Sequence, residues 1–155
     1  MNDLTVRIVT LEPLRVASFH GFGPNPEHLA AEKLVAWAGP RGDLTDIAHH
    51  RIFGFNNPNP SPGSPNYGYE FWIVVGPEVA PTAEVPIKEF AGGRYAVTRC
   101  RGVEGIGATW GRLVAWLSDS QHGHAAHQWL EEHLNPVFPA AEDELLLDLY
   151  APIAG

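Results

Sequence analysis

The chain has 155 residues, of which 45% are hydrophobic and 18% are charged. This length favours one domain, and the apolar content is sufficient for a packed core, which excludes a globally disordered chain. The formal net charge is −8 and no dense run of Lys or Arg occurs, so direct binding to DNA or RNA is not expected. Cys100 is the single cysteine, which excludes an intramolecular disulfide. No window approaches the roughly 18 continuous apolar residues of a membrane span. We expect one cytoplasmic domain over residues 1–155, without membrane contact.

An internal repeat organises the sequence. The tetrapeptide LVAW at 34–37 recurs 79 residues later at 113–116, and the same offset relates two further pairs of short segments. One offset that holds at three separated places indicates two related halves. We place these halves at about 1–78 and 83–155, joined by a short connector.

The first half predicts a strand, a helix and two strands, in that order. A run with β-branched and aromatic residues at 15–22 is typical of a strand. Asn25 as N-cap and Pro26 in the first turn predict the start of a helix, and Gly39-Pro40 predicts its end. Two strands are then expected at 49–55 and 67–75.

The second half predicts the same order of elements. A strand is expected at 94–101, followed by a helix with an apolar stripe at i, i+3, i+4 and i+7. The stripe residues are Trp110, Leu113, Val114 and Leu117. Two strands are expected at 127–134 and 144–153. The fold class is therefore α+β, with two pseudo-symmetric β-α-β-β repeats, a mostly antiparallel sheet, helices on one face and a ligand groove on the other.

An acid two residues before an aromatic recurs in the last strand of each half. Because side chains alternate along a strand, Glu70 and Trp72 share one face, and so do Asp148 and Tyr150. The leucines that alternate with Asp148 should lie against the helices, so the acids should line the uncovered face. A desolvated carboxylate among aromatic rings suits an organic cation. The alternative is that both acids are ordinary solvent-facing strand residues.

A pair of consecutive acids in the second half is a further candidate. If 127–134 is a strand, Glu131 and Glu132 point to opposite faces and one of them faces the groove. If the segment is helical, both acids can be solvated. We include Glu132 among the candidate ligand residues.

Other motifs do not indicate catalysis or a cofactor. The pattern H-x-H-x-x-H at 122–127 lacks a neighbouring Cys or carboxylate, so we expect no metal site. Cys100 is interpreted as a strand cysteine. No phosphate-binding loop or G-x-S-x-G elbow occurs, so nucleotide use and serine hydrolysis have no support. We expect no cofactor.

Taken together and in order, six segments resemble the GyrI-like effector-binding domain of AraC-type and MerR-type transcription regulators. They are RVASFHGFGP, YGYEFWIVV, FAGGRYAVTRCRG, TWGRLVAWL, WLEEHLNP and LLLDLYAPI, which cover nearly the whole chain. The combination of YEFW, GGRYAV and EEHLNP is most similar to integron-associated members that bind cationic drugs. The sequence lacks a helix-turn-helix segment, so the resemblance implies a stand-alone ligand binder or one that acts through a partner.

The resemblance implies a function and a set of site residues. We expect binding of lipophilic, cationic small molecules in a groove between the repeats, with a role in transcription regulation through a protein partner or a homodimer. Glu70 is the preferred anchor, because the closing strand carries an Asp instead of the longer Glu. The full set of expected ligand-binding residues is Glu70, Trp72, Asp148, Tyr150, Tyr69, Phe71 and Glu132.

Two alternative functions stay open. Some GyrI-like proteins hydrolyse strained cyclopropane-bearing DNA alkylators, and a carboxylate with a raised pKa among aromatic rings would suit general acid–base catalysis. Inhibition of a protein target such as gyrase would use the acidic surface. No local motif supports inhibition of a protein target. The sequence does not separate ligand binding from hydrolysis, and we favour a binding protein over a hydrolase.

Overall fold

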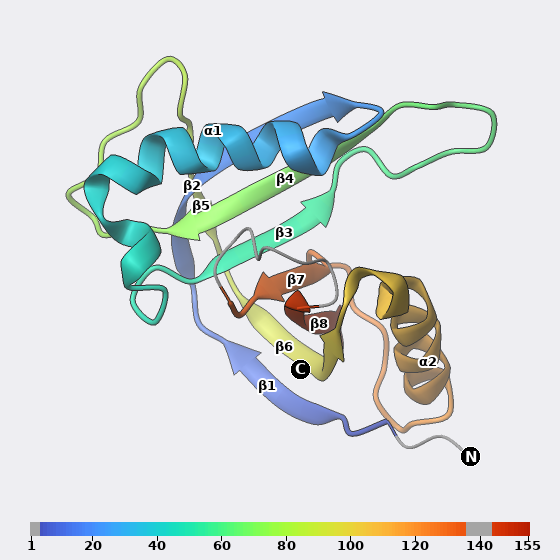
Figure 1. Ribbon diagram of the computed structural model, residues 1–155. Coiled ribbons are helices and arrows are strands. Elements are labelled where there is room, and N and C mark those ends of the chain that lie inside the picture. The colour runs from blue at the N-terminus through green and yellow to red at the C-terminus, as the bar shows by residue number, and fades with distance from the viewer. Residues whose placement is uncertain (1–3, 136–143) are drawn as a thin grey trace. The chain divides into compact units, whose positions relative to one another are not determined.

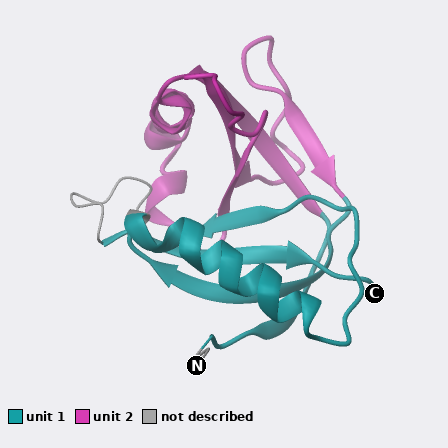
Figure 2. Cartoon of the chain, turned by 90° about the vertical axis from the view of Figure 1, so that its right-hand side faces the viewer, with its two compact units in different colours: residues 1–13, 91–155 teal, residues 14–90 magenta. Residues whose placement is uncertain are grey.

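The computed structural model describes residues 4–135 and 144–155 (Figure 1). The chain divides into two compact units (Figure 2). Residues 14–90 form unit 2, and residues 1–13 together with 91–155 form unit 1. Within the described residues, no helix is long and apolar enough to cross a membrane.

Unit 2 is an antiparallel sheet with a helix against one face. Its sheet has the strand order β3-β4-β2-β5. The elements are β2 (Leu14–Gly23), α1 (Pro26–Arg41), the 3-10 turn η1 (Asp43–Thr45), β3 (Ile52–Asn56), β4 (Tyr67–Val74) and β5 (Ile87–Phe90).

Small residues allow α1 to lie close to β2. A Cβ added at Gly21 would lie 2.4 Å from the carbonyl oxygen of Pro26, so the helix backbone almost touches the strand there. On the same strand face, the Phe19 ring packs against the Trp37 ring of α1 at 5.7 Å. The register pairs Phe19 with Phe71 of β4, so the odd-numbered residues of these strands face α1.

The C-terminus of α1 differs from the predicted one. The helix continues through Gly39 and Pro40 to Arg41 and ends at Gly42, which has φ +80°. A proline in the last turn removes one N–H, whereas a left-handed glycine turns the chain out of the helix. The end at Gly39-Pro40 that the sequence suggested is therefore wrong by two residues.

Unit 1 repeats the order strand, helix, strand, strand. Its antiparallel sheet has the strand order β1-β6-β8-β7. The elements are β1 (Arg7–Leu11), β6 (Gly93–Arg101), η2 (Val103–Gly105), α2 (Ile106–Ser118), β7 (Leu130–His133) and β8 (Leu146–Pro152).

Leucines join α2 to the sheet of unit 1. Leu113 and Leu117 of α2 are buried against Leu147 and Leu149 of β8. This confirms that the leucine face of β8 lies against the helix. Val114, which was expected on the same stripe, is 39% exposed, so the helix buries a narrower face than predicted.

The predicted α+β class and the β-α-β-β order are confirmed. Strands β1 and β5 were not predicted, and both are short. In the chain β1 directly precedes β2 but pairs with β6, and β5 precedes β6 but pairs with β2. For this reason the compact units differ from the expected halves at 1–78 and 83–155.

Candidate functional site

The carboxylate of Glu70 is the centre of a dense hydrogen-bond network within unit 2. Its Oε2 accepts hydrogen bonds from Ser18 Oγ at 2.7 Å and Trp72 Nε1 at 2.6 Å. The same oxygen accepts one from Lys88 Nζ at 2.7 Å, and Oε1 accepts one from Asn57 Nδ2 at 3.1 Å. Glu70 is thus held in one position by side chains from several segments.

Strand alternation and register bring these residues together. Glu70 and Trp72 point to the face of β4 opposite α1, as the sequence predicted. The register places Trp72 opposite Ser18 of β2, and places Lys88 of β5 opposite Val16, two residues earlier on β2. Ser18 and Lys88 therefore reach the carboxylate from neighbouring strands on the same face.

These contacts keep Glu70 ionised despite its burial. Glu70 is 2% exposed, and burial by itself raises the pKa of a carboxyl group. Hydrogen bonds from Lys88, Ser18, Trp72 and Asn57 outweigh burial, so the pKa of Glu70 lies below its ordinary value of 4.5. The raised pKa that the hydrolase alternative would use is not found at Glu70, because hydrogen-bond donors surround the buried carboxylate.

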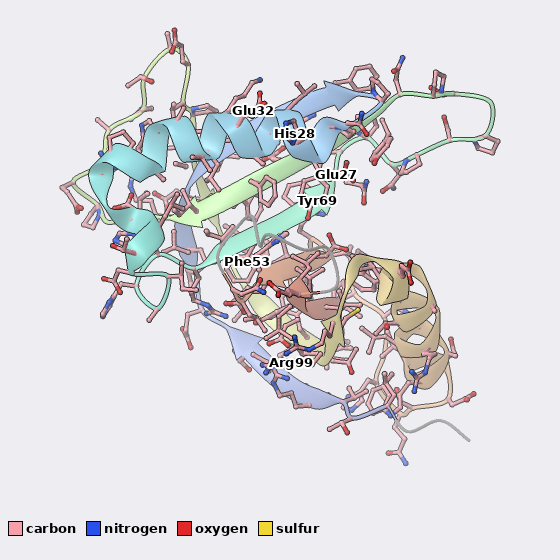
Figure 3. All side chains as sticks on the ribbon, in the orientation of Figure 1. Glu27, His28, Glu32, Phe53, Tyr69 and Arg99 are labelled. Carbon is pink, nitrogen blue, oxygen red and sulfur yellow. The ribbon has the colours of Figure 1, made fainter. Side chains whose placement is uncertain are left out.

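Aromatic rings surround the network on the same face. The Trp72 ring meets the Phe55 ring edge-on at 4.9 Å and the Phe90 ring at 5.3 Å. Phe53 lies opposite Trp72 on β3 and is fully buried (Figure 3). The sheet therefore supplies an apolar surrounding to a single buried carboxylate.

A cavity of about 930 Å³ reaches this carboxylate within unit 2. Glu70, Lys88 and Ser18 line it together with side chains from α1. Its walls are completed by Phe19, His20, Lys33, Ala36, Trp37, Asn57, Pro58, Glu84, Val85 and Pro86. The volume is in the range of cavities that hold drug-sized molecules.

Lys33, His20 and Glu84 also line the cavity. Lys33 Nζ donates to the carbonyl oxygen of His20 at 2.7 Å. His20 Nε2 lies 2.6 Å from the carbonyl oxygen of Asn57. Glu84 is exposed at the cavity wall. Glu70 is thus the buried carboxylate of this cavity, and Glu84 is the solvated one.

Two expected aromatic residues lie elsewhere. Tyr69 and Phe71 occupy the α1-facing side of β4, where their rings pack together at 4.9 Å, and neither lines the cavity (Figure 3 labels Tyr69). Trp72 contacts the carboxylate through its N–H without forming a cavity wall. The aromatic rings that line the cavity are those of Trp37 and Phe19, on the α1 side of the sheet.

In unit 1, Asp148 is surrounded by arginines. Arg99 Nε donates to Asp148 Oδ1 at 3.0 Å, and Arg7 donates to Oδ2 (Figure 3 labels Arg99). The side chain of Asp148 is 3% exposed, whereas those of Arg7 and Arg99 are 48% and 55% exposed. The hydrogen bonds to Asp148 raise the pKa of Arg99. The charge of Asp148 is therefore balanced within its own unit.

The consecutive acids of β7 point to opposite faces. Glu132 pairs with Asp148 in the register and accepts a 2.6 Å hydrogen bond from Tyr150 Oη. Glu131 accepts a 3.0 Å hydrogen bond from Trp110 Nε1 of α2. Glu132 thus shares the face of Asp148 and Tyr150, and Glu131 faces the helix.

The candidate metal-binding histidines have other contacts. His122 stacks on Trp116 at 6.0 Å, and His127 Nε2 lies 2.8 Å from the carbonyl oxygen of Arg94. In residues 4–135 and 144–155, no group of three His, Cys, Asp or Glu side chains is arranged to hold a metal ion.

Sequence reasoning missed three residues that bind the Glu70 carboxylate. Ser18 lies on the same face of the sheet as Glu70, but no motif in the sequence marks it. Lys88 lies on a strand that was not predicted. Asn57 begins the proline-rich segment 57–66, and Asn57 and Pro58 line the cavity. Position in that segment was the one available signal.

Solved structures of other proteins share the fold of this chain. The crystal structure of the EcmrR C-terminal domain matches with a TM-score of 0.70 and 11% identity over 99% of both chains. In the cryo-EM structure of the EcmrR–DNA complex, this chain covers 57% of EcmrR, with a TM-score of 0.69 and 11% identity. The chain thus spans little more than half of that protein.

Two further solved structures share the fold. The integron cassette protein VCH_CASS2 of Vibrio cholerae matches with a TM-score of 0.57 and 14% identity, over 99% of this chain and all of that one. SAV2435 bound to tetraphenylphosphonium matches with a TM-score of 0.58 and 15% identity, over 97% of this chain and 94% of that one.

A family model described as Cass2, integron-associated effector binding protein, matches residues 7–153. Because this match covers nearly the whole chain, the protein belongs to the Cass2 family of integron-associated effector-binding proteins.

Proposed function

We propose that this protein binds lipophilic organic cations in the cavity of unit 2, with Glu70 as the counter-charge. The observation that carries the proposal is the ionised, buried carboxylate of Glu70 at the wall of a 930 Å³ cavity. Electrostatic attraction is strongest where water is excluded, so one such carboxylate favours a cation over a neutral molecule of the same shape.

The walls of the cavity fit a lipophilic ligand. Trp37 and Phe19 supply aromatic rings on the α1 side of the sheet, and Val85 and Pro86 supply aliphatic surface. These side chains would bury the apolar part of a ligand. SAV2435, which shares the fold, was solved with tetraphenylphosphonium, a lipophilic cation. That compound is therefore a suitable probe.

The state of Glu70 favours binding over hydrolysis. A general acid at neutral pH needs a raised pKa, whereas the pKa of Glu70 is lowered by its donors. The group stays charged and hydrogen-bonded, which suits a fixed counter-charge. We further propose that the bound state is read by a protein partner in transcription regulation, since the fold occurs in EcmrR, which was solved with DNA.

Isothermal titration calorimetry with matched probes tests the proposal. Tetraphenylphosphonium is the cation, and triphenylphosphine oxide is a neutral molecule of similar shape. Glu70→Gln keeps an acceptor for Ser18 and Trp72 but removes the charge. We expect it to weaken cation binding roughly tenfold, about 1.4 kcal/mol, and to leave the neutral probe unchanged.

Glu84→Gln is the control, because it removes an exposed carboxylate from the same cavity wall. It should weaken cation binding less than twofold, about 0.4 kcal/mol. Equal effects of the two substitutions, or equal loss of both probes in Glu70→Gln, would contradict a specific counter-charge at Glu70.

A further inference from the structure

The position that a ligand's cation would take beside Glu70 is occupied by the protein itself. Lys88 Nζ lies 2.7 Å from Glu70 Oε2, while the other donors to the carboxylate, Ser18, Trp72 and Asn57, are neutral. Among these donors, Lys88 alone carries a charge. A second cation next to the same oxygen would be repelled by the ammonium group of Lys88.

The two partners of this ion pair differ in their access to water. The side chain of Glu70 is 3% exposed, whereas that of Lys88 is 45% exposed and lines the same cavity. Lys88 is on β5, a four-residue strand at the end of the sheet order in its unit. A flexible lysine stem can carry its ammonium group into solvent at low cost, and the carboxylate cannot follow.

The neutral donors would remain when Lys88 leaves. Ser18 and Trp72 are 5% and 6% exposed, and each is fixed by its strand. They would hold the carboxylate in its present orientation for an incoming cation, so the site is pre-organised apart from Lys88.

We propose that Lys88 is a resident counter-ion that a ligand's cation must displace from Glu70, so that Lys88 sets the affinity and charge selectivity of the cavity. This inference rests on the proposed function of Glu70. A neutral ligand fills the cavity and leaves the ion pair intact. A cation can pair with Glu70 only when Lys88 moves into solvent, and this displacement costs free energy. Cations with little apolar surface to bury therefore bind weakly.

Lys33 allows direct displacement to be separated from general repulsion. It lines the same cavity and carries the same charge, but its Nζ donates to the His20 carbonyl oxygen and not to Glu70. Both lysines are on the exposed side of their elements. If Lys88 acts only through the overall field of the cavity, Lys33→Met and Lys88→Met should have equal effects.

Calorimetry with tetraphenylphosphonium and triphenylphosphine oxide tests the inference on the full chain. We expect Lys88→Met to bind the cation about three- to fivefold more tightly than wild type, because an ion pair of this exposure is worth that much. Because both lysines line the cavity, each variant is judged by the ratio of its affinities for the cation and for the neutral probe. Lys33→Met should change this ratio less than twofold, and Lys88→Arg should keep it near the wild-type value.

A double substitution tests whether Lys88 acts through Glu70. In the Glu70→Gln background, Lys88→Met should no longer tighten cation binding, because no carboxylate is left to compete for. Thermal unfolding of each variant verifies that it is folded before titration.

The movement of Lys88 can also be observed directly. Lysine side chains methylated with ¹³C-formaldehyde keep their charge, and the Lys88 signal is assigned by its absence in Lys88→Met. Saturating tetraphenylphosphonium should move this signal to the position of a solvated lysine, whereas triphenylphosphine oxide should leave it in place.

The possible failures are distinguishable. If tetraphenylphosphonium binds neither wild type nor Lys88→Met, or binds Glu70→Gln as well as wild type, the proposed function is overturned together with this inference. If Glu70→Gln weakens binding but Lys88→Met fails to tighten it, or Lys33→Met has the same effect, the role of Glu70 stands and displacement of Lys88 is wrong.

Discussion

The indole N–H of Trp72 donates a 2.6 Å hydrogen bond to Oε2 of Glu70, two residues earlier on the same strand. Side chains at i and i+2 lie on the same face of a strand, so the chain carries its carboxylate and one of its donors in a single tripeptide. Trp72 therefore influences the site by its hydrogen bond to Glu70, and it does not itself line the cavity.

Trp72→Phe should separate the hydrogen bond from the charge. It removes the donor but keeps an aromatic ring, and should lower the free energy of unfolding by about 2 kcal/mol through the lost bond and volume. The pKa of Glu70 should rise, because one of the contacts that lower it is lost. Tetraphenylphosphonium should bind about threefold more weakly, less than the loss in Glu70→Gln.

The pKa of Glu70 is measured by NMR titration of the carboxyl carbon. Phe90→Leu is the control, since the Phe90 ring packs on Trp72 at 5.3 Å without a bond to the carboxylate. An unchanged pKa of Glu70 in Trp72→Phe would show that the indole N–H does not stabilise the charge.

Asp148 should matter for stability through its arginines. Replacing both Arg7 and Arg99 by methionine removes these two cations from a buried carboxylate, which should cost about 3 kcal/mol. Asp148→Asn leaves two arginines that are half exposed and can be solvated, so its cost should be smaller, about 1 kcal/mol.

Urea unfolding at pH 7 measures this asymmetry. Equal costs for the double arginine variant and for Asp148→Asn would mean that water reaches the carboxylate. Calorimetry on Asp148→Asn also decides whether this acid takes part in ligand binding, as the sequence led us to expect.

Two glycines should respond to alanine with opposite signs. Gly21→Ala places a Cβ 2.4 Å from the Pro26 carbonyl oxygen and 2.8 Å from the Ala30 nitrogen, both backbone atoms of α1. The helix would have to move, which should cost at least about 2 kcal/mol. Gly39→Ala meets nothing within 4 Å inside α1, and should stabilise by about 0.5–1 kcal/mol.

Thermal and urea unfolding of the two variants check this prediction. A neutral effect of Gly21→Ala would show that α1 does not rest on β2 as closely as the geometry indicates. Retention of cavity binding in Gly39→Ala is expected, since Gly39 does not line the cavity.

His133 should make stability depend on pH. Burial lowers the pKa of His133 from 6.5 to about 4. The unfolded chain takes up a proton at His133 below pH 6.5, whereas the folded protein resists it until about pH 4. This contribution to stability is therefore complete above pH 6.5, falls by about 3 kcal/mol as the pH drops to 4, and then levels off.

The test compares the slope of unfolding free energy against pH in wild type and His133→Gln, between pH 7 and 4. His133→Gln should be less stable at pH 7 but should lose much of the slope. A wild-type slope in His133→Gln would overturn the assignment.

Local features of this protein follow from the order of its residues alone. Alternation along 67–75 placed Glu70 and Trp72 on one face and Tyr69 and Phe71 on the other, because the side-chain period of a strand depends on no distant contact. The same rule separated the leucines of β8 from Asp148. The order and type of the main elements followed from hydrophobic periodicity. The predicted helix end at Gly39-Pro40 was wrong because the last turn of a helix tolerates a proline.

The partners of those side chains depend on long-range strand pairing. Lys88 reaches Glu70 because β5 pairs with β2, and Arg7 reaches Asp148 because β1 pairs with β6, and no local pattern announces either short strand. These partners give each buried acid a cation from a distant part of its own unit, Lys88 for Glu70 and the two arginines for Asp148. The pKa of a buried carboxyl depends on donors that are close in space and can be far apart in the chain, so the lowered pKa of Glu70 does not follow from the local sequence.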